Sequence, residues 1–483
     1  MYTKLGMFIG GKWIYETERG CGEDVLNPAD ESILGFLPHA SEYHLDDAIK
    51  SSKIGFEQWE NTHPDKRSQI ILKAADILAQ RTDQVSQVMT LEQGKPLAES
   101  VGEINQSIAI LKFNGTSAKL IKDELVADRD SGLKTFIKPQ PLGICLCLTA
   151  WNFPIALVIR KIAPALAAGC SVIIKPSEET PGTAIEVVKI FQEAGLPKDV
   201  INLVFGVPHE ISDYLLSRDE VKKLSFTGSV PVGKLLAKKS AETLKRCTLE
   251  LGGHSPAIIA EDADIETTLD TLTGFKFRNA GQVCIAPSRF YVHENIYDRV
   301  KDGFLKRIQN ITLGNGINEG VSMGPLSNSR RMDAMKDFLD DAVNKGANII
   351  YGGSRHKDIG YFWEPTLIEN ISENSKMMTQ EIFGPILALF KFNDYDDVIK
   401  KANSLNYGLA SYVYTSNEAL QEKMAKEIIA GGVSINTASP LHPEIPYGGI
   451  KESGIGYEGG MDAIYAFIHK KNINIVLTTR GEI

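Results

Sequence analysis

The sequence lacks the features that would place the protein in a membrane, on nucleic acid or in an oxidising compartment. No apolar run reaches the ~20 residues of a membrane span, and the first residues contain no signal-peptide core. The net charge is −9 with a pI of about 5.6, whereas nucleic acid requires a basic face. The six cysteines include no CxxC pair and no zinc-like spacing with the nine histidines. We expect a cytoplasmic protein with no metal site and no nucleic-acid or membrane partner.

Nothing in the composition indicates disorder. A chain of 483 residues with 43% hydrophobic and 23% charged content is long enough for two or three domains with proper cores.

Short apolar runs alternate with helical periodicity through the middle of the chain. The runs at 144–148, 171–175, 200–204 and 223–226 are each followed by a turn and then a helical pattern. This alternation predicts a parallel sheet covered on both faces, which binds nucleotides at the carboxyl ends of its strands.

The flanking segments predict further elements. Residues 45–121 indicate three helices, divided by Pro64 and by the Gly94–Pro96 break. A second α/β series begins near Pro256. Residues 123–140 are β-like with a turn at Gly132, and we expect 473–478 to pair with them near Thr135, within one chain or across a subunit boundary.

One cysteine stands where a substrate can reach it. Cys284 follows a helix-like run that breaks at Gly281. A cysteine attacks electrophiles as the thiolate and needs a local base or donor. Glu250, in Leu-Glu-Leu-Gly-Gly, is a candidate base, and Asn152, in Trp-Asn-Phe-Pro, is a candidate oxyanion donor. Without an obvious partner histidine, this set indicates a thioester enzyme unlike the papain-type hydrolases.

A glycine-containing turn closes one predicted strand and opens a helix. It contains Gly228, Ser229 and Gly233, and amides at such a helix start suit a phosphate. Its spacing does not match GxGxxG, so a tight turn without a ligand fits equally well.

Two other strand and loop segments have an equally plain structural reading. Lys175 ends a strand and Glu178 follows; an acid there accepts hydrogen bonds from ribose and repels a 2′-phosphate, although both could simply be solvated. The loops at 381–385 and 446–449 could each be structural turns.

Considered as one set, these motifs resemble the aldehyde dehydrogenase superfamily in order and spacing, closest to succinate-semialdehyde dehydrogenases. The resemblance covers essentially the whole chain. It implies an aldehyde dehydrogenase-like α/β fold and a homodimer or homotetramer. The implied parts are a Rossmann-type NAD-binding domain (1–122 and 140–251), an α/β catalytic domain (252–450), a small β oligomerisation arm (123–139 and 470–483) and a return segment (451–469).

The resemblance also implies the chemistry. Cys284 would add to the aldehyde carbon, and the Asn152 amide with the Cys284 backbone N–H would hold the resulting oxyanion. After hydride transfer, Glu250 would direct water onto the thioester. The implied cofactor is NAD, with NADP possible, and its implied contacts are Trp151, Lys175, Glu178, Gly228, Ser229, Gly233, Glu381 and Phe383.

The substrate is implied by two arginines. Arg160 and Arg278 stand where succinate-semialdehyde dehydrogenases hold the substrate carboxylate, which an arginine matches fork to fork. His442 stands where that group usually has a serine, which leaves 2-oxoglutarate semialdehyde or a sulfonate or phosphonate aldehyde as alternatives. Ala286 replaces a second cysteine, which argues against a vicinal disulfide.

Two other classes fit less well. A coenzyme-A-acylating relative usually lacks the deacylating glutamate, which is present here as Glu250. A non-catalytic, crystallin-like binding protein would not need cysteine, glutamate and asparagine together.

Overall fold

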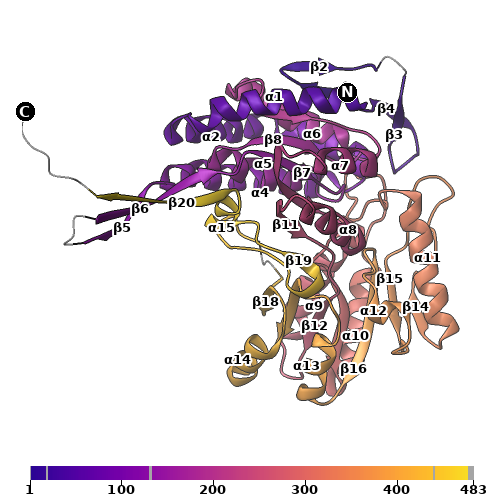
Figure 1. Ribbon diagram of the computed structural model, residues 1–483. Coiled ribbons are helices and arrows are strands. Elements are labelled where there is room, and N and C mark those ends of the chain that lie inside the picture. The colour runs from indigo at the N-terminus through magenta and orange to yellow at the C-terminus, as the bar shows by residue number, and fades with distance from the viewer. Residues whose placement is uncertain (1, 18–19, 130–132, 439–440, 477–483) are drawn as a thin grey trace, which may run out of the picture.

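The computed structural model describes residues 2–17, 20–129, 133–438 and 441–476. Two lobes and a projecting arm are visible in Figure 1. Within the described residues, no helix is long and apolar enough to cross a membrane.

The first lobe is built on an eight-stranded sheet in the order β19-β11-β10-β7-β8-β9-β1-β2. The five strands from β11 to β9 are parallel, and the chain order reverses between β7 and β10. The four strands predicted from the apolar runs are confirmed as β7 to β10. The bounds are β1 Met7–Ile9, β2 Lys12–Ile14, β7 Ile144–Leu148, β8 Ser171–Lys175, β9 Ile201–Leu203, β10 Val221–Thr227, β11 Arg246–Glu250 and β19 Gly454–Ile455.

Both faces of this sheet are buried, as the continuous apolar runs predict. Cys145 and Cys147 pack into one core, whereas Leu146 and Leu148 pack into another on the opposite face. The covering helices are α1 Glu42–Glu60, α2 Pro64–Gln80, α3 Thr82–Gln93, α4 Leu97–Ser117, α5 Pro154–Ala168, α6 Pro181–Ala194, α7 Pro208–Leu216 and α8 Val230–Ala241.

The helical segment before the sheet differs from the prediction of three helices. It contains four, because the chain leaves helical geometry at Arg81, where φ is −105° and ψ is 13°. Helical periodicity continues across this single residue, so the sequence pattern conceals the break. A separate hairpin, β3 Gly22–Leu26 with β4 Ile33–Pro38, lies before α1.

The second lobe is built on a seven-stranded sheet in the order β14-β15-β16-β13-β12-β17-β18, in which only β14 is antiparallel among the described strands. Its strands are β12 Ser255–Ile259, β13 Pro287–His293, β14 Asn348–Tyr351, β15 Thr366–Glu369, β16 Ile386–Phe392, β17 Ala410–Tyr414 and β18 Gly432–Ile435. Its helices are α9 Ile265–Phe277, α10 Tyr297–Ile308, α11 Ser329–Asn344, α12 Lys376–Thr379, α13 Tyr395–Asn403 and α14 Glu418–Glu427.

The arm is a three-stranded antiparallel sheet of β5 Glu124–Asp128, β6 Leu133–Pro141 and β20 Ile468–Val476, and it extends away from both lobes (Figure 1). Asn474 pairs with Thr135 inside one chain, as the β pattern predicts. The predicted turn residue Gly132 and residues 477–483 of the arm lie outside the described residues. Helix α15 Gly460–Tyr465 leads from the first lobe into β20.

Trp59 joins the outer helix α1 to α5. Its ring is fully buried, and Nε1 donates to the carbonyl of Leu166 at 3.0 Å. We expect Trp59→Ala to lower the free energy of unfolding by about 3–5 kcal/mol, because it leaves a large cavity and removes one hydrogen bond to the Leu166 carbonyl, which still accepts from Gly169 N–H. Urea denaturation measures this change. Tyr43→Ala on the same helix is the control; that ring is 69% exposed, and its loss should cost under about 0.5 kcal/mol.

Candidate active site

The carboxyl ends of three adjacent strands in the first sheet bring predicted site residues together. Asn152 follows β7, Ser229 follows β10, and Glu250 ends β11. The backbone N–H of Gly228 donates to the carbonyl of Glu250 at 3.1 Å, which joins the two turns. These ends flank the point where strand order reverses, which is where open α/β sheets bind ligands.

The turn after β10 leaves the start of α8 open. Ser229 is the N-cap residue, but its side chain makes no capping hydrogen bond. Gly233 packs against Leu251; a Cβ at Gly233 would stand 2.4 Å from Leu251 Cδ2. Glycine therefore lets the first turn of α8 press onto the segment that follows Glu250.

Lys175 and Glu178 lie at the end of the neighbouring strand β8. Their charged groups are 2.6 Å apart, and Glu178 Oε1 also accepts from the backbone N–H of Gly206 at 3.1 Å. The carboxylate is thus held at the sheet edge by two donors and is not freely solvated.

Glu381 and Phe383 come from the second lobe and face the same edge. Glu381 Oε1 accepts from the N–H of Gly253 at 3.3 Å, and burial raises the pKa of its carboxyl to about 7. The Phe383 ring meets Trp151 edge to face, with ring centroids 5.6 Å apart. The structure therefore groups the predicted cofactor contacts of both lobes.

Cys284 lies in the loop between α9 and β13. The preceding residues Asn279 and Ala280 have left-handed backbone angles (φ 50° for both), and Gly281 continues the turn at φ 73°. A Cβ at Gly281 would be 2.2 Å from the carbonyl oxygen of Gly384, so only glycine fits here. The helix itself ends earlier than the break predicted at Gly281, at Phe277, because the residues that follow leave helical geometry.

Asn152 reaches across to this loop. Its Nδ2 donates to the carbonyl of Gln282 at 3.0 Å, two residues before the thiol. An amide nitrogen carries two hydrogens, so this bond orients the second N–H. The Cys284 Sγ lies 3.9 Å from the Tyr447 hydroxyl.

Burial dominates the electrostatics of the thiol and the predicted base. It raises the pKa of Cys284 to about 12, with further increases from the nearby carboxylates of Glu381 and Glu250. Burial also raises the pKa of Glu250 well above its ordinary value, and Glu458 adds to this, whereas Lys161 and Arg160 oppose it. Neither carboxyl oxygen of Glu250 has a hydrogen-bond partner within the described residues. Lys161 and Glu458 themselves form a buried ion pair at 2.5 Å.

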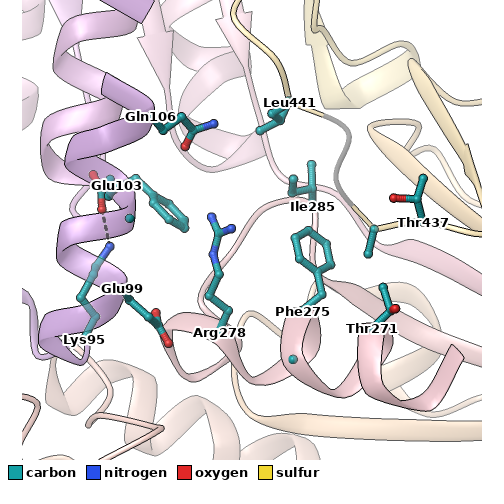
Figure 2. A pocket seen from close by; sticks show the side chains of 14 residues that line it. Lys95, Glu99, Glu103, Gln106, Thr271, Phe275, Arg278, Ile285, Thr437 and Leu441 are labelled. Atoms are coloured by element: carbon teal, nitrogen blue, oxygen red, sulfur yellow. Dashed lines mark hydrogen bonds and ion pairs between the residues drawn. The ribbon is translucent and has the colours of Figure 1, made fainter. Parts of the chain in front are cut away.

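A cavity of about 570 Å³ opens beside Cys284. Its wall includes Ile285, which follows the thiol directly, and Arg278, which points into the space between α4 and α9 in Figure 2. The guanidinium lies over the rings of Phe153 and Phe275, at 5.0 and 5.8 Å from their centroids. Stacking occupies the faces of a guanidinium and leaves its in-plane N–H donors for an anion.

The other two predicted substrate residues do not line this cavity. Arg160 is buried within α5, where it opposes the raised pKa of Glu250. Its Nη1 would lie 3.8 Å from a Cβ built on Gly459. His442 is exposed, and its neighbour Leu441 faces the cavity.

Several residues of the site escaped the sequence analysis. They are Lys95, Glu99, Glu103, Gln106, Asn279 and Gln282, all on the cavity wall or in the hydrogen bonds beneath it. One signal was available: Glu103 falls on the buried face of α4 in step with Ser107, Ile110 and Asn114. A carboxylate in such a position needs a partner.

Two mainly parallel sheets, with a thiol in a loop of the second lobe that is hydrogen-bonded to Asn152 at the carboxyl edge of the first sheet, define the class as a two-lobed α/β enzyme. The model of the aldehyde dehydrogenase family matches residues 13–473. The chain therefore belongs to the aldehyde dehydrogenase family, and it is an NAD(P)-dependent oxidoreductase.

The similar proteins cover nearly the whole chain. A mitochondrial succinate-semialdehyde dehydrogenase of Oryza sativa subsp. japonica is 37% identical over 457 residues, covering 94% of this chain and 86% of that protein. A 3-sulfolactaldehyde dehydrogenase of Pseudomonas putida is 34% identical over 470 residues, covering 97% and 96%. The crystal structure of a succinate-semialdehyde dehydrogenase from Burkholderia pseudomallei superposes with a TM-score of 0.96 at 33% identity, covering 98% of each chain.

The raised pKa of the Cys284 thiol predicts slow alkylation of the free enzyme. Below its pKa of about 12, the thiolate fraction and hence the iodoacetamide rate at this residue should rise about tenfold per pH unit, without a plateau up to about pH 10. Mass spectrometry of the peptide containing Cys284 measures the rate, and the exposed Cys21 reports reagent activity in the same digest. A plateau near pH 8 would contradict the buried thiol.

Proposed function

We propose that this enzyme oxidises a small aldehyde with an anionic tail to the carboxylic acid, with succinate semialdehyde as the substrate. The observation that carries this proposal is the Arg278 guanidinium, which faces a cavity bounded by the residue next to Cys284. In this proposal Cys284 takes the aldehyde end of the substrate and Arg278 takes its terminal carboxylate.

The thiol of Cys284 is the nucleophile of the proposal. Once the thiol proton has passed to solvent, the thiolate sulfur adds to the aldehyde carbon, and the carbonyl oxygen becomes the negatively charged oxygen of a thiohemiacetal. The second N–H of the Asn152 amide and the backbone N–H of Cys284 hold that oxygen. Such donors act only as charge develops, and losing one typically costs ~10²–10³ in rate.

Glu250 is the base of the second half-reaction. Once a thioester has formed on Cys284, the carboxylate takes a proton from water, and the hydroxide displaces the thiolate to release the acid. Two oxygens on a buried carboxyl without a hydrogen-bond partner suit this role, because no donor among the described residues competes with water. Lys161 and Arg160 favour the charged form of Glu250, whereas burial and Glu458 oppose it and keep the pKa of this carboxyl raised.

The strand ends fit a dinucleotide, preferably NAD. The start of α8 at Ser229 lacks a side-chain cap, which suits a pyrophosphate. Glu178 suits the adenosine ribose and repels a 2′-phosphate, while Lys175 at 2.6 Å moderates that repulsion and leaves NADP possible. Glu381 would meet the second ribose, Phe383 would pack near the nicotinamide, and Trp151 would line the cofactor channel. When bound, the nicotinamide accepts the hydride.

A sulfonate or phosphonate tail is the second candidate. The relative from Pseudomonas putida is named for 3-sulfolactaldehyde, and His442 stands in place of the serine expected in succinate-semialdehyde dehydrogenases. Arg278 binds a sulfonate by the same donors. Because His442 lies off the cavity wall, it supplies no argument against a carboxylate.

The oligomeric state and the cellular compartment are proposed from other features of the chain. We place the oligomer interface on the arm, whose strands expose Leu125, Val126, Ile475 and Val476, as a homodimer or homotetramer. Six free cysteines fit a reducing cytoplasm.

Glu250→Gln should separate the two half-reactions. The first turnover should keep a burst of about one reduced cofactor per site, while the steady-state rate falls at least about 10²-fold. Because burial raises the pKa of Glu250 in the folded enzyme, the deprotonated form and therefore kcat should increase with pH above the ordinary carboxyl range. This increase of kcat with pH should be absent in the variant. Stopped-flow absorbance measures both. Cys284→Ala is the control and should lose burst and turnover alike; a burst in that variant would contradict the nucleophile.

Arg278→Ala should discriminate between substrates. We expect kcat/KM for succinate semialdehyde to fall by about 10- to 100-fold, because a charge-assisted hydrogen bond to the tail is lost, whereas butanal should change by less than about threefold. Steady-state kinetics with each cofactor, extended to a sulfonate aldehyde, measures this and ranks the tails.

Arg160→Ala is the matched comparison for Arg278→Ala. Because that arginine lies beside Glu250 and off the cavity wall, its loss should affect charged and uncharged aldehydes equally. Equal losses for both aldehydes in Arg278→Ala would exclude tail recognition by this residue.

A further inference from the structure

The backbone of Asn152 is held by two buried donors that the proposed reaction does not use. Lys95 Nζ and Asn279 Nδ2 each donate to the carbonyl of Asn152 at 2.8 Å. Lys95 is 1% exposed and lies just before α4, with its ammonium also over the ring of Phe153 at 4.2 Å. A fully buried ammonium that contacts the main chain of the predicted oxyanion donor calls for a physical explanation.

Glu103 completes this arrangement from one turn and a half along α4. Its Oε2 accepts from Lys95 Nζ at 2.5 Å (Figure 2), and its Oε1 accepts from the N–H groups of Ile155 and Ala156 at 3.1 and 3.0 Å. Those amides belong to the first turn of α5. The pair therefore fixes the carbonyl of Asn152 and, three and four residues later, the start of the following helix.

The side chain of Asn152 is fixed from the other lobe. Its Nδ2 donates to the carbonyl of Gln282, and the same carbonyl receives a weaker bond from Asn279 Nδ2 at 3.4 Å. Asn279 is in turn oriented by Gln93 Nε2, which donates to its Oδ1 at 2.8 Å. Main chain and side chain of Asn152 are thus restrained separately, which is what a hydrogen-bond donor needs to hold a short-lived charge without rearrangement.

Stability alone explains the Lys95–Glu103 pair poorly. Taking two charges out of water costs about as much as their attraction returns, and apolar residues of similar volume often replace such pairs without loss. Capping α5 needs only the Glu103 carboxylate. The contact from Lys95 to the Asn152 carbonyl serves neither purpose.

We propose that Lys95 and Glu103 are positioning residues that set the place of the Asn152 amide and so the strength of the oxyanion hole. This inference rests on the proposed role of Asn152. The pair acts through Asn152 and touches no reacting atom, so its contribution should exist only while the amide is present.

A double-mutant cycle between Lys95→Met and Asn152→Ala tests the inference. In each variant kcat and KM for the preferred aldehyde are measured, together with the melting temperature. Asn152→Ala should lower kcat by about 10²–10³ and Lys95→Met by about 10–10², with KM changed by less than about threefold. The double variant should equal Asn152→Ala within about threefold. Losses that multiply would overturn the inference.

A second variant covers the case in which Lys95→Met alone does not fold, because it leaves Glu103 charged and unpaired. Lys95→Met with Glu103→Gln removes both charges while keeping an oxygen for the α5 amides. The same cycle with Asn152→Ala then applies: a loss absent from the Asn152→Ala background supports the inference, and a loss of the same factor in both backgrounds overturns it.

Glu92→Gln is the matched control. Glu92 caps another helix start in the same way, with Oε2 accepting from Gly182 N at 2.7 Å and Oε1 from Thr183 N at 2.8 Å, but it contacts neither Asn152 nor the Cys284 loop. Its effect on kcat should be the same with and without Asn152→Ala. Full activity of Asn152→Ala would refute the oxyanion role and this inference with it, whereas a large loss there with multiplying effects of Lys95→Met would refute only the positioning role.

Discussion

The hydrogen bond from Asn152 Nδ2 to the carbonyl of Gln282 is the contact on which the candidate active site depends. It joins a loop at the carboxyl edge of the first sheet to the loop of the second lobe that contains Cys284. Neither loop is regular structure, so its position is not fixed by the sheet ladders. Buried polar groups that satisfy one another within a low dielectric are strong and directional. This is why the surrounding polar residues matter as much as the thiol.

The same low dielectric governs the ionisable groups around that contact. Burial raises the pKa of Cys284, Glu250 and Glu381, and it raises the pKa of Glu99, beside Arg278, to about 7. Because the neutral form of each of these four side chains is favoured, they add little negative charge to the active site before substrate binds. The developing oxyanion then meets fixed dipoles and few competing ions, which suits electrostatic catalysis.

The sequence predicted the elements that show regular hydrophobic periodicity and the breaks that are marked by glycine or proline. Strands buried on both faces, the break at Gly94, and the pairing of the 473–476 segment with the arm around Thr135 follow from pattern and turn chemistry, and all are present. The break predicted at Gly281 comes earlier, because α9 ends at Phe277. The break at Arg81 leaves no mark, because no glycine or proline accompanies it. Lys95 and Glu103 were missed for another reason: a lysine and a glutamate near a helix start resemble solvated charges until tertiary packing buries them. Arg278 lines the cavity and Arg160 does not, and the sequence could not distinguish them for the same reason. Spacing along the chain does not say which way a side chain faces.

The link between the two lobes has one further consequence. A Cβ at Gly252 would stand 2.3 Å from Glu381 Oε2, and one at Gly253 would stand 2.8 Å from the Cys284 carbonyl oxygen, so this stretch runs through a seam with no room for side chains. Glu250, at the end of the first sheet, and Cys284, in the second lobe, come together only after the two lobes have packed against each other along this stretch. During refolding, recovery of secondary structure should therefore precede the regain of enzymatic function, and the interval between them is the time that lobe docking takes.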